Sequence, residues 1–512
     1  MSTATRPRPF EGRSLSDVVS ELAEEVRELY TADEVPWVVG YSGGKDSTAI
    51  LQLVWLALQG LPAEQRTKPV YVISTDTLVE NPVVAAWVAR SLDTMKKAAD
   101  EQGLPIKPNR LTPKVEDTFW VNLIGRGYPA PRPKFRWCTE RMKIKPSNRF
   151  IRQVVRRHGE AILVLGIRKA ESQARARAMA KHEKRRVRDR LSPNGNLPNS
   201  LVYSPIEEWS NDEVWTFLMQ QSNPWGYNNK DLLTMYQGAS ADSECPLVVD
   251  DTTPSCGDSR FGCWTCTLVD QDKSMTAMID NDRETNAWMI PLLTLRNELD
   301  DTSKEKETRD FRRMNGRVQL FNDRIIQGPY TQKAREDWLR KLLRAQAHVR
   351  KHGPEEARDI ELITVEELHE IRRIWVFKKH EVEDILPRIY EEETGEKFPG
   401  QDLEDQLVIR ASEIDVLRKI CGDDEIHFNM VRELLAVERE FRTKTRRKGL
   451  YEALEKVIEK GFYEDADDAL AFARKKEEMR AATRDEKDGT STEAASQPQA
   501  LTLDEEINDA SA

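Results

Sequence analysis

A glycine-rich turn near the N-terminus carries the residue types that hold phosphate groups. It joins an apolar run at residues 36–41 to an apolar stretch at residues 49–58, which predicts a strand, a turn and a helix. Backbone N–H groups at such a helix start favour an anion, glycines allow close approach, and a lysine adds a cation. A Walker loop is excluded, because only three residues separate Gly40 from Gly44 and Asp46 follows the lysine. The turn consists of Ser42, Gly43, Gly44, Lys45, Asp46, Ser47 and Thr48.

A cluster of cysteines forms the second group of chemically active residues. Four of the 6 cysteines fall within one short segment, with ten, six and two residues between successive members. In a chain without secretion signals, such clustering indicates a metal centre more than disulfides. Four thiolates suit either zinc or an iron–sulfur cluster, and the spacing alone does not separate the two. The predicted ligands are Cys245, Cys256, Cys263 and Cys266.

A strongly basic segment contrasts with the acidic charge of the whole chain. The net charge is −10, yet residues 131–190 hold 20 Lys and Arg against 5 Asp and Glu. Within residues 168–190 the count is ten against three. Phosphate contacts need only cations on a flexible backbone, so we expect residues 168–190 to contact a DNA backbone. A solvated charged helix is the alternative explanation.

The elements that position these residues indicate an α/β domain followed by a helical one. Apolar runs at 36–41, 70–74 and 161–165 are separated by helical stretches, which suits parallel strands buried on both faces. We predict an α/β domain at 1–240, a Cys-rich cluster-binding segment at 241–330 and a helical domain at 331–480. Residues 481–512 hold 8 acids against 2 bases, and we expect them to be disordered.

Hydropathy and the N-terminus bear on localisation. No run of about 18 uncharged apolar residues occurs, which excludes a helical membrane span. The first residues include no apolar signal region. We therefore expect a cytoplasmic protein with no membrane partner.

The turn resembles the PP-loop of ATP pyrophosphatases, a family with a parallel sheet and helices on both faces. In that family the loop grips the β,γ-pyrophosphate of ATP while the α-phosphorus is attacked. Further stretches are similar to the phosphoadenosine phosphosulfate (PAPS) reductase branch of the fold. They are residues 74–82, Arg136-Trp137-Cys138-Thr139, Gly166-Ile167-Arg168 with Glu171-Ser172, and residues 205–215.

A narrower resemblance follows from the intact loop, the cysteine cluster and the helical extension together. The combination most closely resembles the sulfurtransferases of DNA phosphorothioation, the DndC component of Dnd systems, over about residues 35–330. This resemblance implies ATP, Mg²⁺ and a [4Fe-4S] cluster as cofactors. It also implies a cysteine desulfurase as sulfur donor and other Dnd subunits as partners.

The resemblance implies a role for each candidate residue. The loop residues 42–48 bind the nucleotide together with Gly166, Lys45 and Asp46 act in catalysis, and Asp76 contacts magnesium or ribose. Arg168 and Glu171 orient the activated group. Cys138 lies in a basic stretch, so we expect a depressed pKa and a sulfur-carrying role. Alternatively, Cys138 ligates the cluster and Cys245 or Cys256 is the free thiol.

The expected reaction is adenylylation of a DNA phosphate by ATP, followed by replacement of a non-bridging oxygen with sulfur. Three other functions remain open on the sequence. One is a PAPS or adenylylsulfate reductase, which needs no ATP cleavage. Another is a transfer-RNA thiolase, which uses the same activation on a base. The third is a non-enzymatic iron–sulfur assembly subunit regulated by nucleotide.

Overall fold

The computed structural model describes residues 10, 12–188, 190–239, 262–381, 383–400, 403, 411–442 and 444–488. The candidate ligands Cys245 and Cys256 lie outside the described residues. The chain divides into two compact units. The first comprises residues 1–119, 131–300 and 344–362, and the second comprises residues 120–130, 301–343 and 363–512.

A six-stranded sheet with the order β3-β2-β1-β4-β6-β5 forms the centre of the first unit. Neighbouring strands run parallel except for β5, which pairs antiparallel with β6. The order reverses direction beside β1, so a crevice is expected beyond the carboxyl ends of β1 and β4. The strands are β1 Trp37–Gly40, β2 Val70–Thr75, β3 Ile106–Leu111, β4 Ala161–Val164, β5 Ser192–Pro193 and β6 Ser200–Tyr203.

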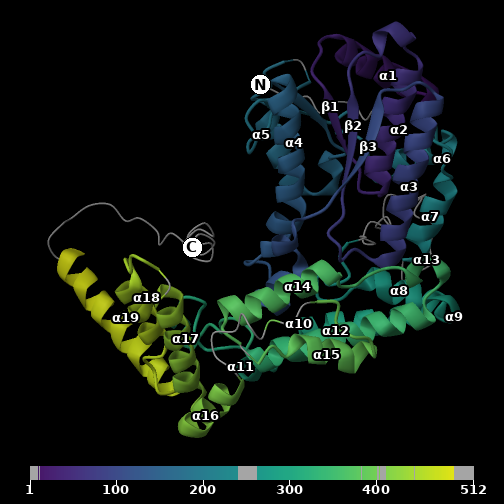
Figure 1. Ribbon diagram of the computed structural model, residues 1–512. Coiled ribbons are helices and arrows are strands. Elements are labelled where there is room, and N and C mark those ends of the chain that lie inside the picture. The colour runs from purple at the N-terminus through teal and green to yellow at the C-terminus, as the bar shows by residue number, and fades with distance from the viewer. Residues whose placement is uncertain are drawn as a thin grey trace. The chain divides into compact units, whose positions relative to one another are not determined.

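Helices cover both faces of this sheet (Figure 1). Successive side chains of a strand point to opposite faces, and in β1 Trp37 and Val39 join one core while Val38 joins the other. The larger core packs α1 (Leu15–Thr31), α2 (Lys45–Gln59), α3 (Pro82–Glu101) and α6 (Asn211–Gln220) against the sheet. The smaller core packs α4 (Lys145–His158) on the other face.

The rest of the first unit is helical. Its remaining helices are α5 Gln173–Glu183, α7 Asn229–Gly238, α8 Lys273–Asn281, α9 Arg283–Asn286, α10 Ile290–Asp300 and α13 Glu355–Arg358. A π-helical turn covers Thr139–Ile144, and 3₁₀ turns cover Ala63–Gln65, Val115–Asp117, Lys169–Glu171 and Ala287–Met289. Helix α12 (Gln332–His352) begins in the second unit and ends in the first.

The second unit is built from helices around a core that includes Leu339, Ile371 and Trp375. The indole of Trp375 donates a hydrogen bond to the carbonyl oxygen of Ile124 (2.9 Å), which anchors the π-helical turn Val121–Arg126 in this unit. Its other elements are α11 Glu305–Thr308, β7 Leu320–Phe321, β8 Arg324–Ile325, α14 Val365–Arg373, a π-helical turn Ile374–Lys378, α15 Leu386–Thr394, α16 Ala411–Cys421, α17 Glu425–Arg442, α18 Leu450–Lys460 and α19 Ala466–Asp488.

The predicted fold class is confirmed: a mostly parallel central sheet is followed by a helical C-terminal region. Within the expected Cys-rich segment, residues 262–300 belong to the first unit and residues 301–330 to the second. Helix α19 continues to Asp488. Residues 489–512 lie outside the described residues, and the disorder expected for the C-terminal tail stays a prediction. Among the described residues, no helix is long and apolar enough to cross a bilayer.

Candidate active site

The glycine-rich turn leads from the carboxyl end of β1 into the first turn of α2. Gly43 has a φ of 77°, and a Cβ there would lie 2.5 Å from Val88, so the position requires glycine. Within the described part of the chain, the N–H groups of Gly44, Asp46 and Ser47 have no hydrogen-bond partner. Unpaired N–H groups at a helix start attract an anion. The loop therefore has the backbone geometry of a phosphate site.

Charged side chains complete this loop. Asp46 accepts a hydrogen bond from Nε of the buried Arg168 (2.7 Å), and its other carboxylate oxygen lies 3.5 Å from Nζ of Lys45. Lys45 also lies over the ring of Tyr236, whose hydroxyl accepts the Lys45 N–H (3.3 Å). Burial raises the pKa of Tyr236 to about 12. Sequence reasoning missed Tyr236, because no local pattern links it to a loop far away along the chain.

The segment after β4 also contacts the loop. Arg168 donates to the carbonyl oxygen of Trp209 (3.2 Å) as well as to Asp46, so it holds Asp46 in place. Glu171 accepts the Arg168 N–H (3.1 Å) and pairs with Arg175. The structure thus places Arg168 against the loop, whereas the carboxylate of Glu171 binds its chain neighbours Arg168 and Arg175.

Gly166 provides a test of this close packing. A Cβ at Gly166 would lie 2.9 Å from the carbonyl carbon and oxygen of Asp46, so a Gly166→Ala substitution must displace the loop. Because misplacement of about 1 Å costs about 100-fold in rate, we expect the nucleotide-dependent activity of this variant to fall about 10- to 100-fold. Gly195→Ala is the matched control, since nothing lies within 4 Å of its Cβ position. Equal rates in the two variants would contradict the packing argument.

The residues that follow β2 form the next part of the site. Asp76 accepts hydrogen bonds from the Leu78 N–H (2.8 Å) and from Nε of Arg110 (2.9 Å), so its carboxylate is already engaged within the protein. Thr77 donates to Glu80 (3.0 Å). An isolated antiparallel β-bridge between Glu80 and Cys263 joins this segment to the part of the chain that carries Cys263 and Cys266.

Three cysteines lie around this segment. The sulfur of Cys263 lies 3.3 Å from the Thr77 hydroxyl and 3.9 Å from a carboxylate oxygen of Glu80. Cys138 interacts electrostatically with Cys266, and Lys143 interacts with the sulfurs of all three cysteines. The structure therefore groups Cys138, Cys263 and Cys266 near the carboxyl end of β2.

Buried contacts hold the element that carries Cys138 and Lys143. Trp137 stacks on Phe119 at a centroid distance of 5.3 Å. The buried carboxylate of Asp117 accepts from Nη1 of Arg141 (3.4 Å) and from Nζ of Lys145 (3.1 Å). Both cations belong to the helical segment that begins just after Cys138, so these contacts position the thiol.

The protonation of these thiols differs from the expectation. Burial raises the pKa of Cys138, although a depressed value was predicted from the surrounding basic residues. The prediction was wrong because desolvation disfavours the thiolate more than the nearby Lys143 favours it. Burial also raises the pKa of Cys263 to about 12. The pKa of Lys143 is raised to about 12, first by its electrostatic interaction with Cys263 and then by that with Glu80.

A pH series tests the state of Cys263 in metal-free protein. A pKa of about 12 leaves mostly thiol below that pH, so alkylation should keep rising up to about pH 12. At pH 8 the thiolate fraction should be about 2,000-fold below that of a free cysteine with a pKa of about 8.5. Iodoacetamide labelling followed by mass spectrometry measures the rate. Half-maximal labelling near pH 8.5 would contradict the buried environment.

The donor set of these thiols fits a sulfur-ligated centre. Soft thiolates suit zinc or iron–sulfur chemistry, and here they come from two separate chain segments. Among the described residues, only three glutamates bring three ligand atoms within 4.8 Å of one another. One tetrahedral zinc would hold its sulfurs about 3.8 Å apart. The thiol donor set suits both zinc and an iron–sulfur cluster.

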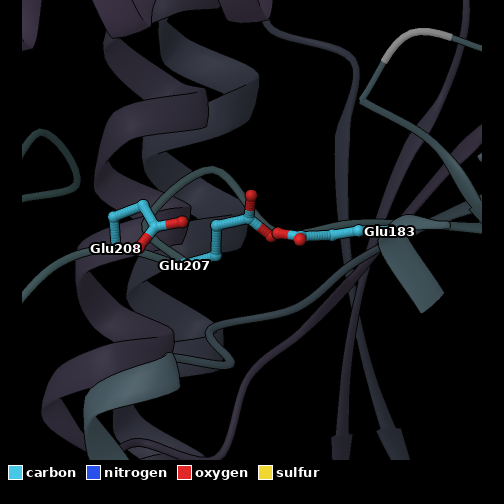
Figure 2. A group of neighbouring side chains, drawn as sticks. All are labelled: Glu183, Glu207 and Glu208. Atoms are coloured by element: carbon cyan, nitrogen blue, oxygen red, sulfur yellow. The ribbon is translucent and has the colours of Figure 1, made fainter. Parts of the chain in front are cut away.

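The three glutamates are Glu183, Glu207 and Glu208, shown in Figure 2. Nζ of Lys169 lies 2.6 Å from Glu183 and also pairs with Glu208, while Arg186 lies 2.9 Å from Glu207. These two cations account for the acidic group. It serves as an ionic link between α5 and the loop after β6.

Ion pairs with carboxylates also neutralise part of the basic segment 168–190. Arg188 pairs with Asp33 (2.9 Å), and Arg190 pairs with Glu25 (3.4 Å). Four of its cations are exposed and have no ion pair among the described residues, namely Arg177, Lys181, Lys184 and Arg185. Among the described residues of the segment, these four unpaired cations are open to an external anion.

Comparison with known proteins agrees with this architecture. Residues 36–268, a little under half of the chain, match the phosphoadenosine phosphosulfate reductase domain. Uncharacterised protein MJ0066 of Methanocaldococcus jannaschii is 28% identical over 201 residues, which cover 39% of this chain and 35% of that protein. The chain thus spans about a third of that relative's length.

A solved structure is also similar. It is the U34-tRNA thiolase NcsA from Methanococcus maripaludis with its [4Fe-4S] cluster. The similarity has 15% identity and a TM-score of 0.28, and covers 58% of this chain and 86% of that chain. The matched region 36–268 contains the glycine-rich loop, the segment after β2 and Cys138, Cys263 and Cys266. Residues 36–268 are thus similar to a phosphoadenosine phosphosulfate reductase domain.

Proposed function

We propose that this protein is an ATP-dependent sulfurtransferase that adenylylates a DNA backbone phosphate and replaces a non-bridging oxygen with sulfur. One observation carries the proposal. The phosphate-type loop follows β1, the Thr77–Cys263 contact follows β2, and these strands are parallel neighbours. Carboxyl ends of parallel strands meet at one edge of a sheet, so nucleotide and thiols share that edge.

The loop residues supply the first half of the reaction. A non-bridging oxygen of DNA attacks the α-phosphorus of ATP, and pyrophosphate leaves with the electron pair of the broken bond. The unpaired N–H groups of residues 44, 46 and 47, with Nζ of Lys45, stabilise that leaving charge. A carboxylate such as Asp46 is also the ligand type that Mg²⁺ prefers.

The thiol group supplies the second half. A sulfur nucleophile at the oxidation state of sulfide attacks the activated DNA phosphorus. It expels AMP, leaves a phosphorothioate and releases one proton. Cys138, Cys263 and Cys266, together with Cys245 or Cys256, would hold a [4Fe-4S] cluster, which would supply Lewis-acidic iron. Lys143 places a positive charge beside these sulfurs and balances negative charge there.

The same proposal predicts the nucleic acid that accepts the sulfur and the proteins that act with this chain. Exposed cations at 177, 181, 184 and 185 support contact with the DNA backbone. The sequence resemblance to DndC supports a cysteine desulfurase as sulfur donor and other Dnd subunits as partners.

The test uses anaerobically purified protein with α-labelled ATP, Mg²⁺, sulfide and duplex DNA. We expect AMP, pyrophosphate and phosphorothioate linkages that mass spectrometry detects after nuclease digestion. AMP formation that requires transfer RNA instead of DNA would assign the chain to base thiolation. Absence of AMP under all conditions would overturn the proposal.

A PAPS reductase is the second candidate, and the match to that domain family favours it. This activity would release sulfite from PAPS with a dithiol as reductant and would need no ATP. Incubation of the same protein with labelled PAPS and dithiothreitol distinguishes the two. Sulfite release without ATP cleavage would favour the reductase.

A further inference from the structure

The second unit contains a large open groove whose lining is basic. Its volume is about 1810 Å³, above the roughly 300–1,000 Å³ of ordinary small-molecule pockets. Fourteen Lys and Arg line it against nine Asp and Glu, in a chain whose net charge is −10. A surplus of positive charge in a groove this large suits an extended anion.

Most acidic residues of the groove are already neutralised. Six of the nine form ion pairs, including Glu305 with Arg309 (2.8 Å), Asp310 with Arg312 (2.8 Å) and Glu433 with Lys460 (3.3 Å). In contrast, six lining cations have no ion-pair partner among the residues that the structure describes. They are Arg126, Lys306, Arg324, Lys333, Lys378 and Lys379.

A buried guanidinium adds an independent observation. Arg432 lines the groove and is 5% exposed, yet its Nε and Nη1 atoms have no hydrogen-bond partner within the described residues. Its remaining nitrogen donates to Asn429 (2.7 Å), and Nη1 lies 3.9 Å from Glu383. Nε of the partly buried Arg126 is likewise unsatisfied. These guanidinium nitrogens are shielded from solvent, so they add positive charge to the groove wall without contacting a ligand directly.

The distribution of the unpaired cations indicates the shape of the ligand. They come from separate elements: Arg126 from a π-helical turn, Lys306 from α11 and Lys333 from α12. Cations spread along an open groove suit a repeating charge, whereas a single phosphate needs them to converge on one point. Guanidinium groups bind phosphate oxygens in a bidentate manner.

We propose that this groove binds the phosphodiester backbone of a nucleic acid, as a second contact in addition to the basic segment 168–190. The inference rests on the proposed function for the choice of nucleic acid over an acidic peptide. It adds a binding role for the helical second unit.

The experiment measures anisotropy of a fluorescein-labelled duplex DNA bound to the full-length chain. The groove variant combines Lys306→Gln, Lys333→Gln and Lys378→Gln, which are exposed and form no ion pair among the described residues. The control variant combines Lys419→Gln, Lys456→Gln and Lys475→Gln, which remove the same charge from exposed positions outside the groove. A third variant combines Lys181→Gln, Lys184→Gln and Arg185→Gln in the basic segment.

We expect the groove variant to bind DNA about 10- to 100-fold more weakly, with a salt slope shallower by about 0.9 for each lost phosphate contact. The control variant should stay within about twofold of wild type, since its lysines lie outside the groove. Equal affinity of the groove and control variants would overturn the proposal, as would loss confined to the basic-segment variant. Tight binding of a labelled peptide with the sequence of residues 481–512, abolished in the groove variant, would assign the groove to an acidic peptide instead.

This readout is independent of turnover. Failure of the sulfurtransferase reaction would leave DNA binding by the groove intact, whereas failure of the groove proposal would leave AMP formation intact. The groove variant should retain AMP formation at saturating DNA, because none of its substitutions touches the glycine-rich loop.

Discussion

Replacement of Lys45 by alanine is expected to lower the rate of AMP and pyrophosphate formation about 100- to 1,000-fold, because removal of one preorganised charge-stabilising group typically costs that much. Lys45 is the cation of the loop, and its Nζ lies 3.5 Å from Asp46 at the start of α2. The loop itself should keep its shape, since Asp46 remains bound to Arg168 (2.7 Å). Thin-layer separation of products from α-labelled ATP measures the rate.

The control for this prediction is Lys97→Ala, which removes an exposed lysine from α3. It should cleave ATP at the wild-type rate. If Lys45→Ala also kept nearly full activity, the loop would not stabilise the leaving pyrophosphate, and the assignment of the nucleotide site would fail.

The second large effect concerns the stability of the helical unit. Arg335 and Glu381 form an ion pair in which the two residues are 2% and 5% exposed, and Nη1 of Arg335 donates to Glu381 (3.1 Å). Removing one partner leaves an uncompensated buried charge. We therefore expect Glu381→Leu to lower the free energy of unfolding of this unit by about 3–5 kcal/mol.

Hydrogen exchange of α14 reports on that unit alone and should accelerate accordingly. The double variant Arg335→Met with Glu381→Leu should recover most of the loss, because paired apolar side chains leave no charge buried. The exposed pair Arg474 and Asp323 provides a control, and Asp323→Asn should leave exchange of α14 unchanged. Unchanged exchange in Glu381→Leu would contradict the expected cost of the unpaired charge.

The two units carry different parts of the proposed chemistry. In the first, the proposed nucleotide loop and the thiols follow neighbouring strands at one sheet edge, so mutations there should change catalysis. In the second, mutations of the groove cations should change nucleic-acid affinity, and mutations of the buried ion pair should change stability. Variants in the two units can therefore be told apart by their readouts.

The sequence alone predicted three strands of the sheet, the loop and the thiols as separate features. Apolar runs bounded by Pro and Gly predicted β1, β2 and β4 within one or two residues, because buried parallel strands leave a continuous apolar pattern. Two glycines followed by a lysine predicted the phosphate-type turn, since that function depends on local backbone geometry.

Only the tertiary structure decided how these features combine. Three contacts join residues that lie far apart in the chain. The hydroxyl of Tyr236 accepts a hydrogen bond from the Lys45 N–H, Glu80 lies beside Cys263, and Asp46 pairs with Arg168. The raised pKa of Cys138 likewise follows from burial, which local sequence does not encode, so the basic neighbours alone indicated the wrong direction. Local patterns specify backbone conformation, whereas desolvation and side-chain pairing depend on which segments fold together.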